Sequence, residues 1–310
     1  MLRSAKPKTA RGKRAQERRQ PQVIENVKRA MVLRGATTSE TVNTALQDLY
    51  ALKKPDAVYF SKKNEILPFE DDTKLEFLTQ RNDTSLFLLG THSKKRPHNL
   101  VMGRMFDFHI LDMLELGIEY AIPAYVFDSV KCAVGSRPLF LFQGDVFDQR
   151  EDYSKFKSLL IDFFHGEEIH GIDLKGIQHL ISVTAGPFPD DGQPGLIFFR
   201  VFALQFKKSG TRTPRVELQE MGPAFDFRIR RTRFADHSIW KEATRVPKEL
   251  QLKKTKNVSR DGLGDTYGRI HLGDQKLDDI QTRKMKALKR IRREKMMGNM
   301  IDDSTVVGLD

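Results

Sequence analysis

The sequence predicts a mixed α/β body flanked by two basic extensions, and two features of the 310-residue chain lead to this prediction. Short apolar runs at residues 85–89, 138–142, 180–184 and 196–206 are typical of buried strands. The amphipathic segment at residues 151–165 has apolar side chains three and four positions apart, which is typical of a helix. Strands mixed with helices in this way predict an α/β or α+β fold.

The N-terminal part is predicted to hold a disordered stretch and two helices. Residues 1–20 have no apolar periodicity and are expected to be disordered when unbound. Apolar spacing predicts a helix over residues 22–34. A second helix is expected to begin at Thr37, where Glu40 lies three residues on and completes a capping box.

Residues 54–117 are predicted to form an irregular segment, a strand, a loop and a helix. Residues 54–82 are charged and are expected to be irregular, and the strand at 85–89 follows them. Residues 91–97 are polar and basic and predict a loop. Residues 99–116 carry apolar side chains at helical spacing, with Gly117 as the residue that ends the helix.

The second half of the chain is expected to use the same kinds of element in another order. Residues 186–195 are rich in Gly and Pro and predict a hairpin loop before 196–206, which is expected to be a central strand. Further strands are predicted at residues 118–127, 213–221 and 223–234. After residue 247 the core pattern is lost, and residues 278–297 predict a basic helical stretch.

Positive charge is concentrated at the two ends of the chain. The formal net charge is +12, yet residues 21–280 are nearly neutral, because residues 1–20 and 281–297 each hold eight Lys or Arg against a single Glu. Cationic ends of this kind favour a polyanion such as nucleic acid. The alternative is a nuclear or nucleolar targeting tail that binds RNA only incidentally.

Composition and missing motifs argue against several classes of protein. No apolar stretch is long enough to span a membrane, and the basic N-terminus lacks the apolar region of a secretory signal. The single cysteine, Cys132, excludes a disulfide framework and a multi-cysteine zinc site, and it is expected to be a core thiol. The sequence contains no P-loop, no G-x-S-x-G and no Rossmann fingerprint. We therefore expect no catalytic residue and no cofactor.

Two groups of acidic and histidine side chains fail as metal sites. His165 and His170 are five residues apart with Gly166 between them, whereas zinc binding on one helix face needs a spacing of four. Asp107, His109 and Asp112 lie at offsets that do not converge on one point of the predicted helix. Both groups are expected to be surface or satisfied polar positions, so no metal is predicted.

The basic loop before residue 99 is a candidate phosphate site. Lys94, Lys95 and Arg96 lie between a predicted strand and a predicted helix, and Arg104 lies in the second turn of that helix. Backbone N–H groups at a helix N-terminus together with flanking cations suit a phosphate. A solvated surface loop is the equally weighted alternative.

The strand at residues 223–234 is a second candidate for nucleic-acid binding. Phenylalanines and arginines alternate along it, so Arg228 and Arg230 are expected on one face, and the phenylalanines, with Arg231, on the core face. Arg233 adds a fourth guanidinium. Arginine without lysine favours phosphate and planar bases, because its fork binds two oxygens and stacks. The alternative is an edge strand that charge protects against aggregation.

The basic C-terminal stretch is the third candidate. Met285, Leu288 and Ile291 are spaced to give only a narrow apolar stripe, so this segment is expected to be largely disordered until RNA neutralises it. Its eight cations are predicted RNA ligands: Arg283, Lys284, Lys286, Lys289, Arg290, Arg292, Arg293 and Lys295.

Two stretches of sequence resemble the Brix-domain proteins of ribosome assembly. The first is GTHSKKRPHNL, residues 90–100, followed by Gly103-Arg104. The second is VELQEMGP, residues 216–223, followed by FDFR, residues 225–228, which is similar to the C-terminal signature of the family. The resemblance implies a Brix domain over residues 28–245. Composition and periodicity predict a basic disordered extension at residues 1–20, a helical and irregular lead-in at 21–82 that overlaps the start of the domain, and a basic C-terminal extension at 246–310.

The resemblance also implies a fold and a function. Brix domains consist of two similar mixed α/β halves akin to anticodon-binding domains, and they act as non-enzymatic, RNA-binding assembly factors in the nucleolus. One branch forms a stable heteromer with the regulator of ribosome synthesis protein. That branch recruits the 5S RNA and its ribosomal proteins to the precursor of the large subunit, so large-subunit ribosomal RNA is an expected partner, and a membrane or a small-molecule substrate is not.

Two other functions remain open from the residues alone. An RNA-processing enzyme such as a nuclease would need clustered carboxylates for Mg²⁺, and Glu70-Asp71-Asp72 looks instead like a solvated loop. A pure protein-interaction scaffold with targeting tails would lose its RNA affinity once its protein partners are removed.

Overall fold

The computed structural model describes residues 7–18, 26–166, 174–188, 194–248, 250, 256–261, 265–270, 272–273 and 286–304. The chain forms two compact units, Met1–Leu250 and Gln251–Asp310. The predicted mixed α/β class is confirmed. In the described chain, no helix is of a length and apolar character that would let it cross a membrane.

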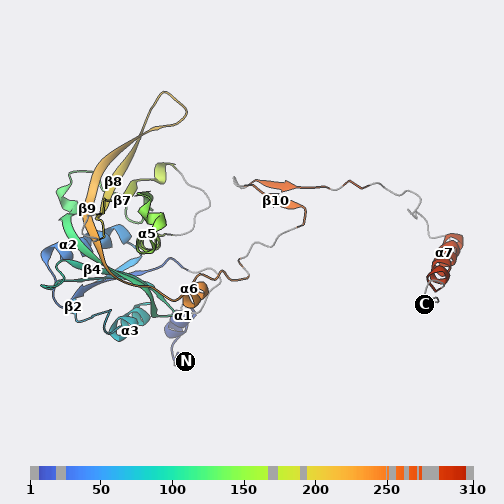
Figure 1. Cartoon of the computed structure of the whole chain (residues 1–310), viewed down its shortest axis with the longest axis horizontal. Helices are drawn as coiled ribbons and strands as arrows, with labels where there is room; N and C mark the ends of the chain where they lie inside the picture. The colour runs from blue at the N-terminus through green and yellow to red at the C-terminus, as the bar shows by residue number, and fades with distance from the viewer. Residues whose placement is uncertain are drawn as a thin grey trace. The chain divides into compact units, whose positions relative to one another are not determined.

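The first unit is built on a nine-stranded mixed sheet, in the order β2-β1-β3-β4-β5-β9-β8-β7-β6 (Figure 1). Its strands are β1 (Ala30–Gly35), β2 (Ala57–Asn64), β3 (Leu86–Thr91), β4 (Asn99–Phe106), β5 (His109–Ile122), β6 (Leu139–Gln143), β7 (His179–Ala185), β8 (Ile197–Lys207) and β9 (Arg215–Arg233). Its helices are α1 (Ala10–Arg18), α2 (Glu40–Lys53), α3 (Thr73–Asn82), η1 (Ala124–Val126), α4 (Val146–Gln149), α5 (Glu151–Phe164), η2 (Leu174–Gly176) and α6 (His237–Ala243).

The second unit is small in its described part. Strand β10 (Val258–Arg260) pairs antiparallel with strand β11 (Thr266–Gly268). Helix α7 (Lys286–Ser304) follows it.

The sheet consists of two halves that repeat one strand arrangement. In the first half β1 runs parallel to β3, and β3, β4 and β5 are antiparallel neighbours. In the second half β6 runs parallel to β7, and β7, β8 and β9 are antiparallel neighbours. The halves meet where β5 pairs with β9. The predicted pair of similar halves is therefore present in the topology.

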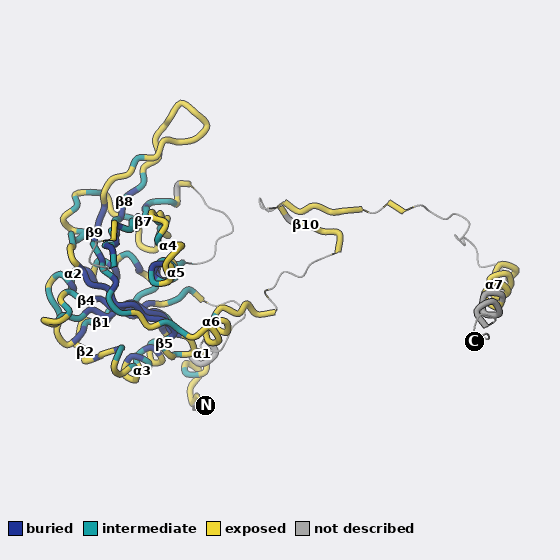
Figure 2. The backbone as a smooth tube through the Cα atoms, viewed as in Figure 1, coloured by how far each residue is buried: buried dark blue, intermediate teal, exposed yellow. Residues whose placement is uncertain are grey.

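Apolar side chains form a core on each face of the sheet. Figure 2 shows that the buried residues of the chain follow the strands of the sheet and the helices that cover it. The larger core lies under α2 and α5 and spans both halves, with α5 supplying Phe156, Leu160 and Phe163. The smaller core lies under α3 and draws on β1, β3, β4 and β5, including Phe87 and Met113. The described second half supplies no residue to the smaller core.

The predicted helix over residues 99–116 is wrong, because these residues form the β4–β5 hairpin. Asp107 and Phe108 both have positive φ, 49° and 63°, and connect Phe106 to His109 in a two-residue turn. Both strands are buried on both faces, so their apolar side chains no longer alternate with polar ones. A continuous apolar run of this kind also fits helical spacing, which explains the error.

Four more predictions in the N-terminal part need correction. Residues 30–35 form strand β1 instead of the end of a helix over 22–34, and residues 20–25 lie outside the described chain. The stretch 54–82, expected to be irregular, contains β2 and α3. Helix α1 occupies part of the stretch 1–20, expected to be disordered, and Thr9 Oγ1 accepts a bond from the N–H of Gly12 at its start. The second predicted helix is present as α2, but Ser39 rather than Thr37 caps it.

The two strands predicted at 213–221 and 223–234 are one strand, β9, with an irregularity in the middle. Its register against β8 shifts between Arg200 and Phe202, opposite the Gly222-Pro223 step. Proline has no N–H for a sheet ladder and is tolerated at a bulge. The predicted break is thus a bulge that the strand continues through.

Gly103 lies in β4 where there is no space for a side chain, and its replacement should be costly. A Cβ at this position would lie 2.5 Å from the ring of Phe87 and 2.7 Å from the carbonyl oxygen of Asp112. We expect Gly103→Ala to lower the free energy of unfolding by about 1–3 kcal/mol, because a packed core must shift to accept it. Gly166→Ala is the control, since its Cβ would meet no atom within 4 Å. Equal urea midpoints for the two variants would contradict the prediction.

Candidate nucleic-acid interface

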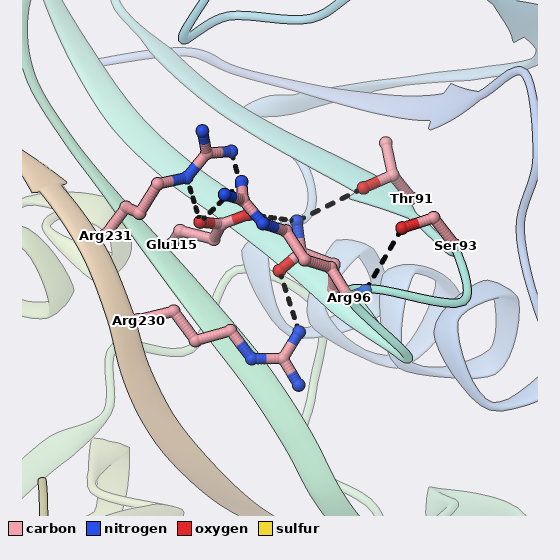
Figure 3. A network of polar contacts seen from close by, with 7 residues as sticks. Thr91, Ser93, Arg96, Glu115, Arg230 and Arg231 are labelled. Carbon is pink, nitrogen blue, oxygen red and sulfur yellow. Dashed lines mark hydrogen bonds and ion pairs between the residues drawn. The ribbon is translucent and has the colours of Figure 1, made fainter. Parts of the chain in front are cut away.

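A bulge in β9 places two consecutive arginines opposite one residue of β5. Leu114 pairs with Thr232 and Leu116 pairs with Ile229, so Arg230 and Arg231 together face Glu115. Phe225, Phe227 and Ile229 are buried in the larger core, as predicted. Arg231 was predicted on that core face and is instead on the face of Arg230, because the bulge interrupts the alternation (Figure 3).

The carboxylate of Glu115 is the centre of this cluster (Figure 3). It is fully buried and accepts hydrogen bonds from Arg231 Nε at 2.5 Å, from Asn99 Nδ2 at 2.7 Å and from Arg96 Nη1 at 3.2 Å. Burial raises the pKa of Glu115, and the bond from Asn99 and the charges of Arg96 and Arg230 oppose that rise. The carboxylate thus holds Arg96 and Arg231 in fixed positions.

Arg230 completes the cluster from the neighbouring position. Its Nη1 donates to Asn99 Oδ1 at 3.3 Å. The guanidinium lies across Gly117, where a Cβ would approach it to 2.4 Å. Gly117 is therefore the residue that makes room for Arg230, and not the end of a helix as predicted. Three guanidinium groups around one carboxylate leave this cluster with a net positive charge.

The basic loop lies beside this cluster, but no helix follows it. Residues 92–98 connect β3 to β4 in a hairpin, so the predicted phosphate site at a helix N-terminus is wrong. The loop is nevertheless ordered: Ser93 Oγ accepts from the N–H of Arg96, and His98 Nδ1 bonds Ser39 Oγ at 2.8 Å. Lys94 and Lys95 are exposed at its tip. Their charges remain available for a phosphate.

Two exposed lysines that the sequence analysis missed lie at the same end of the sheet. Lys62 and Lys63 are near the end of β2, and Lys63 pairs in register with Arg34 of β1. Because β1, β2 and β3 are parallel, their carboxyl ends lie at one edge. The sequence analysis did not identify these two lysines because residues 54–82 were expected to be irregular, so no strand was predicted to carry them to the sheet. We call this surface the basic edge: Lys62, Lys63, Lys94, Lys95, Arg96, Arg230 and Arg231.

Phe69 is another missed contributor to the basic edge. The guanidinium of Arg231 lies over its ring, with 4.1 Å from Cζ to the ring centroid. A cation above an aromatic face is stabilised by the electrons of the ring. Phe69 thus adds a second contact to Arg231 besides the bonds to Glu115, and no spacing in the sequence relates Phe69 to Arg231.

Arg104 is not part of the basic edge, contrary to the prediction. Its side chain is only 7% exposed, and its Nη2 lies 2.6 Å from Asp112 Oδ2. Its Nη1 donates to Asp162 Oδ2 of α5 at 2.7 Å and to Ser158 Oγ at 3.2 Å. The ring of Trp240 covers the guanidinium. Arg104 therefore joins β4 to α5 inside the protein and cannot reach a phosphate.

The other two predicted arginines of β9, Arg228 and Arg233, are paired at the surface. Arg228 Nε donates to Glu119 at 3.2 Å, and Arg233 Nη1 lies 3.2 Å from Asp72. Surface pairs of this kind are weak and can be exchanged for an external phosphate. The structure thus places Arg228 and Arg233 in ion pairs with Glu119 and Asp72, outside the Glu115 cluster.

The C-terminal cations are partly described. Arg283 and Lys284 lie outside the described residues. The other six predicted ligands are exposed on α7, in agreement with the predicted basic helical stretch: Lys286, Lys289, Arg290, Arg292, Arg293 and Lys295. Leu288 and Ile291, of the predicted apolar stripe, are about half exposed.

The groups considered as metal sites do not converge. Asp107 is in the β4–β5 turn, His109 bonds Glu76, and Asp112 pairs with Arg104. His170 lies outside the described residues. Among the described side chains, no three His, Cys, Asp or Glu groups are placed to hold a metal ion. Cys132 is partly buried against the larger core, with its N–H directed at Met221 Sδ.

Comparison with known proteins places the chain in a family. The Brix domain model matches residues 35–231. The human ribosome production factor 2 homolog is 49% identical over 266 residues, which cover 86% of this chain and 85% of that protein. Ribosome biogenesis protein RPF2 of Saccharomyces cerevisiae is 44% identical over 294 residues, which cover 93% of this chain and 86% of that protein.

Solved structures are also similar to this chain. A probable ribosomal biogenesis protein from Aeropyrum pernix K1 is 9% identical with a TM-score of 0.39, and the match covers 65% of this chain and 96% of that one. The family model covers more than half of the chain, and both relatives exceed 40% identity over most of their length. The chain therefore belongs to the Brix-domain family, and within it to the ribosome production factor 2 proteins.

Proposed function

We propose that this protein is a non-enzymatic assembly factor of the large ribosomal subunit that works in the nucleolus. It binds ribosomal RNA and, together with the regulator of ribosome synthesis protein, recruits the 5S RNA and its ribosomal proteins to the precursor particle. The observation that carries this proposal is the match to proteins named for ribosome production over most of their length. The basic edge and the exposed cations of α7 support the RNA-binding part.

The geometry of the basic edge suits a phosphate backbone. Lys94 and Lys95 project from a loop that its own hydrogen bonds hold in place, and arginines fixed by Glu115 lie beside it. Cations held in advance lose less conformational entropy on binding. Such contacts position RNA without reading its sequence.

Charge reversal in the loop tests the role of the basic edge. We expect Lys94→Glu with Lys95→Glu to weaken binding of 5S RNA about tenfold, and to reduce the slope of log K against log salt by about 1.4–1.8, which corresponds to two lost contacts. The matched control is Lys74→Glu with Arg81→Glu on α3, which changes the net charge equally at another exposed site. Equal losses in both variants would show that only net charge matters and would refute a site at this edge.

The nuclease alternative has its own test. Magnesium-dependent cleavage of 5S RNA that survives repurification, and that disappears on mutation of one carboxylate cluster, would overturn the non-enzymatic assignment. The scaffold alternative is separated by a titration of RNA with the purified chain, with and without the partner protein. That alternative predicts no RNA binding by the chain alone.

A further inference from the structure

The hairpin of β8 and β9 extends beyond the strands on either side of it. β7 pairs with β8 only as far as Ala203, and β5 pairs with β9 only from Ala224 onward. Residues 204–207 therefore pair with residues 215–218 and with no other described strand, and a loop joins the two segments. Figures 1 and 2 show this exposed hairpin projecting from the first unit. We call residues 204–218 the arm.

The hydrophobic core does not depend on the arm. The equivalent hairpin of the first half, between β4 and β5, closes with a two-residue turn at Asp107 and Phe108. Neither core contains a residue of the arm. From residue 205 to residue 218 every residue is exposed except Glu217, which is half-buried. A two-stranded ribbon of this kind is at best marginally stable in water, so the stability of the fold does not explain the length of the arm.

Positive charge is concentrated at the tip of the arm. Residues 207–215 hold four cations and no carboxylate: Lys207, Lys208, Arg212 and Arg215. Glu217 is the one carboxylate of the arm; it bonds Lys207, and its Oε1 lies 3.1 Å from Arg215 Nη2. In the part of the chain that the structure describes, no ion pair includes Lys208 or Arg212. These two cations can therefore neutralise an external anion.

The loop at the tip is held by hydroxyl groups of its own side chains. Ser209 Oγ and Thr211 Oγ1 both donate to the carbonyl oxygen of Thr213, the second at 3.1 Å. Ser209 Oγ also accepts from the N–H of Thr211 at 3.2 Å. Gly210 has a φ of 76°, which lies in the left-handed region that favours glycine. These contacts fix the loop before any ligand binds, which reduces the entropy lost on binding.

The composition of the tip favours the phosphate backbone of double-helical RNA. Lysine, arginine, serine and threonine are side chains that contact phosphate oxygens, and residues 207–213 contain no other kind except Gly210. Sites for single-stranded nucleic acid add aromatic side chains on which bases stack, and the tip has none. The core of a protein interface needs apolar side chains, which the arm carries farther from its tip, at Phe206, Val216 and Leu218. Double-stranded RNA is recognised mainly through its shape, its phosphates and its 2′-hydroxyl groups.

The tip lies far from the basic edge along the same strand. Arg215 is the first residue of β9, and Arg231 of the basic edge is near the end of β9. A strand rises about 3.3 Å per residue, so these two arginines are separated by about 50 Å along β9. An RNA that touches both sites must therefore present two separate segments to the protein.

We infer that the tip of the arm is a second RNA-binding site of the first unit, which holds the phosphates of a double-helical segment of the 5S RNA. Lys208 and Arg212 supply the contacts, and the hydroxyl-bonded loop presents them. The inference rests on the proposed function, because that function supplies the RNA.

Titration of 5S RNA with the full chain across a salt series tests the inference. We expect Lys208→Gln with Arg212→Gln to weaken binding about tenfold and to reduce the slope of log K against log salt by about 1.4–1.8, which corresponds to two lost contacts. The circular dichroism and the thermal midpoint should not change, because both side chains are exposed. The matched control is Lys74→Gln with Arg81→Gln on α3, which removes the same charge and should bind like the wild type.

A shorter arm removes the whole tip. Asn-Gly in place of residues 207–215 would close the hairpin with a two-residue turn of the type that such strands favour. We expect this chain to keep the wild-type thermal midpoint, since neither core contains a residue of the arm, and to lose at least as much RNA affinity as the glutamine variant. Val216→Thr with Leu218→Thr removes apolar surface from the arm and leaves its charge, so this variant should bind RNA like the wild type.

A tethered probe shows whether the tip contacts RNA directly. Cys132 is the only cysteine, so a chain with Cys132→Ser can carry a hydroxyl-radical source on a single new cysteine. The source on Pro214→Cys should cleave a double-helical segment of the 5S RNA. The source on Pro97→Cys in the basic loop should cleave a different segment, because that loop lies beside Arg231 at the other end of β9.

Several results would overturn the inference. They are wild-type RNA affinity in both arm variants, an equal loss of affinity in the α3 control, and cleavage of the same nucleotides from both probe positions. Arm variants that keep their RNA affinity but no longer bind the regulator of ribosome synthesis protein would make the arm a protein surface, which also overturns it. Unchanged RNA binding by the arm variants refutes this site alone, whereas no binding of 5S RNA by the wild type refutes the RNA binding of the proposed function as well.

Discussion

Replacement of Arg104 by methionine should lower the free energy of unfolding by about 3–5 kcal/mol. The change leaves the buried carboxylate of Asp112 without its cation, and an uncompensated buried charge is among the costliest defects in a protein. Burial alone would raise the pKa of Asp162, but the bonds and charges of Lys28 and Arg104 hold that pKa below its ordinary value. Removal of Arg104 thus weakens two carboxylate contacts at once.

Urea denaturation at neutral pH measures this effect. Arg233→Met is the matched control, because Arg233 is half exposed and pairs with Asp72 at the surface, where the cost should stay within about 1 kcal/mol. A double variant, Arg104→Met with Asp112→Leu, should recover part of the loss, since it removes the unpaired charge. If Arg104→Met unfolded like the control, the buried network would not be a major source of stability.

The fold could be predicted from the sequence in segments whose apolar periodicity fits only one kind of secondary structure. Helix α5 and strands β6 and β7 match their predicted ranges closely, because each has a clear apolar period and flanking breaks. The β4–β5 hairpin could not be predicted in this way. It is buried on both faces, and the turn at Asp107 and Phe108 has neither the glycine nor the asparagine that usually marks it.

The sequence identified most of the basic residues of the candidate site but not the contacts that hold them in place. Lys94, Lys95, Arg96, Arg230 and Arg231 were identified from charge alone, and the structure brings them to one end of the sheet. Glu115 was missed because a carboxylate in an expected helix gave no sign of a role. Arg104 was misplaced because charge in a sequence does not reveal burial, which here depends on residues more than fifty positions away in α5.

The two halves of the sheet correspond strand by strand, and the apolar pattern of one stretch of sequence cannot reveal this correspondence. Each half alone reads as a mixture of strands and helices, and only the sheet register shows that β1, β3, β4 and β5 correspond to β6, β7, β8 and β9. Once this correspondence is drawn, the short connection at residues 165–178 becomes informative. The described second half has no counterpart of β2 and α3, and this difference is visible only when the two halves are compared.

Deletion of the chain from residue 281 onward should flatten the salt dependence of RNA binding. If half of the eight cations between residues 283 and 295 touch phosphate, the slope of log K against log salt should fall by about three units. Between 50 and 200 mM salt, such a slope difference changes the relative affinity of the two chains by about 60-fold. Partner binding should be intact, because the body of the chain in the first unit, Met1–Leu250, is expected to supply the partner contact.

A deletion of residues 298–310 alone is the control, since it keeps all eight cations and removes the acidic end of the chain. Its slope should equal that of the full chain. On α7 the described cations are exposed around the helix and form one local pair, Arg290 with Glu294 at 3.3 Å, so most of their charge is free of carboxylates on that helix. Counterion release on phosphate contact then follows directly. A tail that served only for targeting would leave the slope unchanged, and that result would exclude direct RNA contact by this segment.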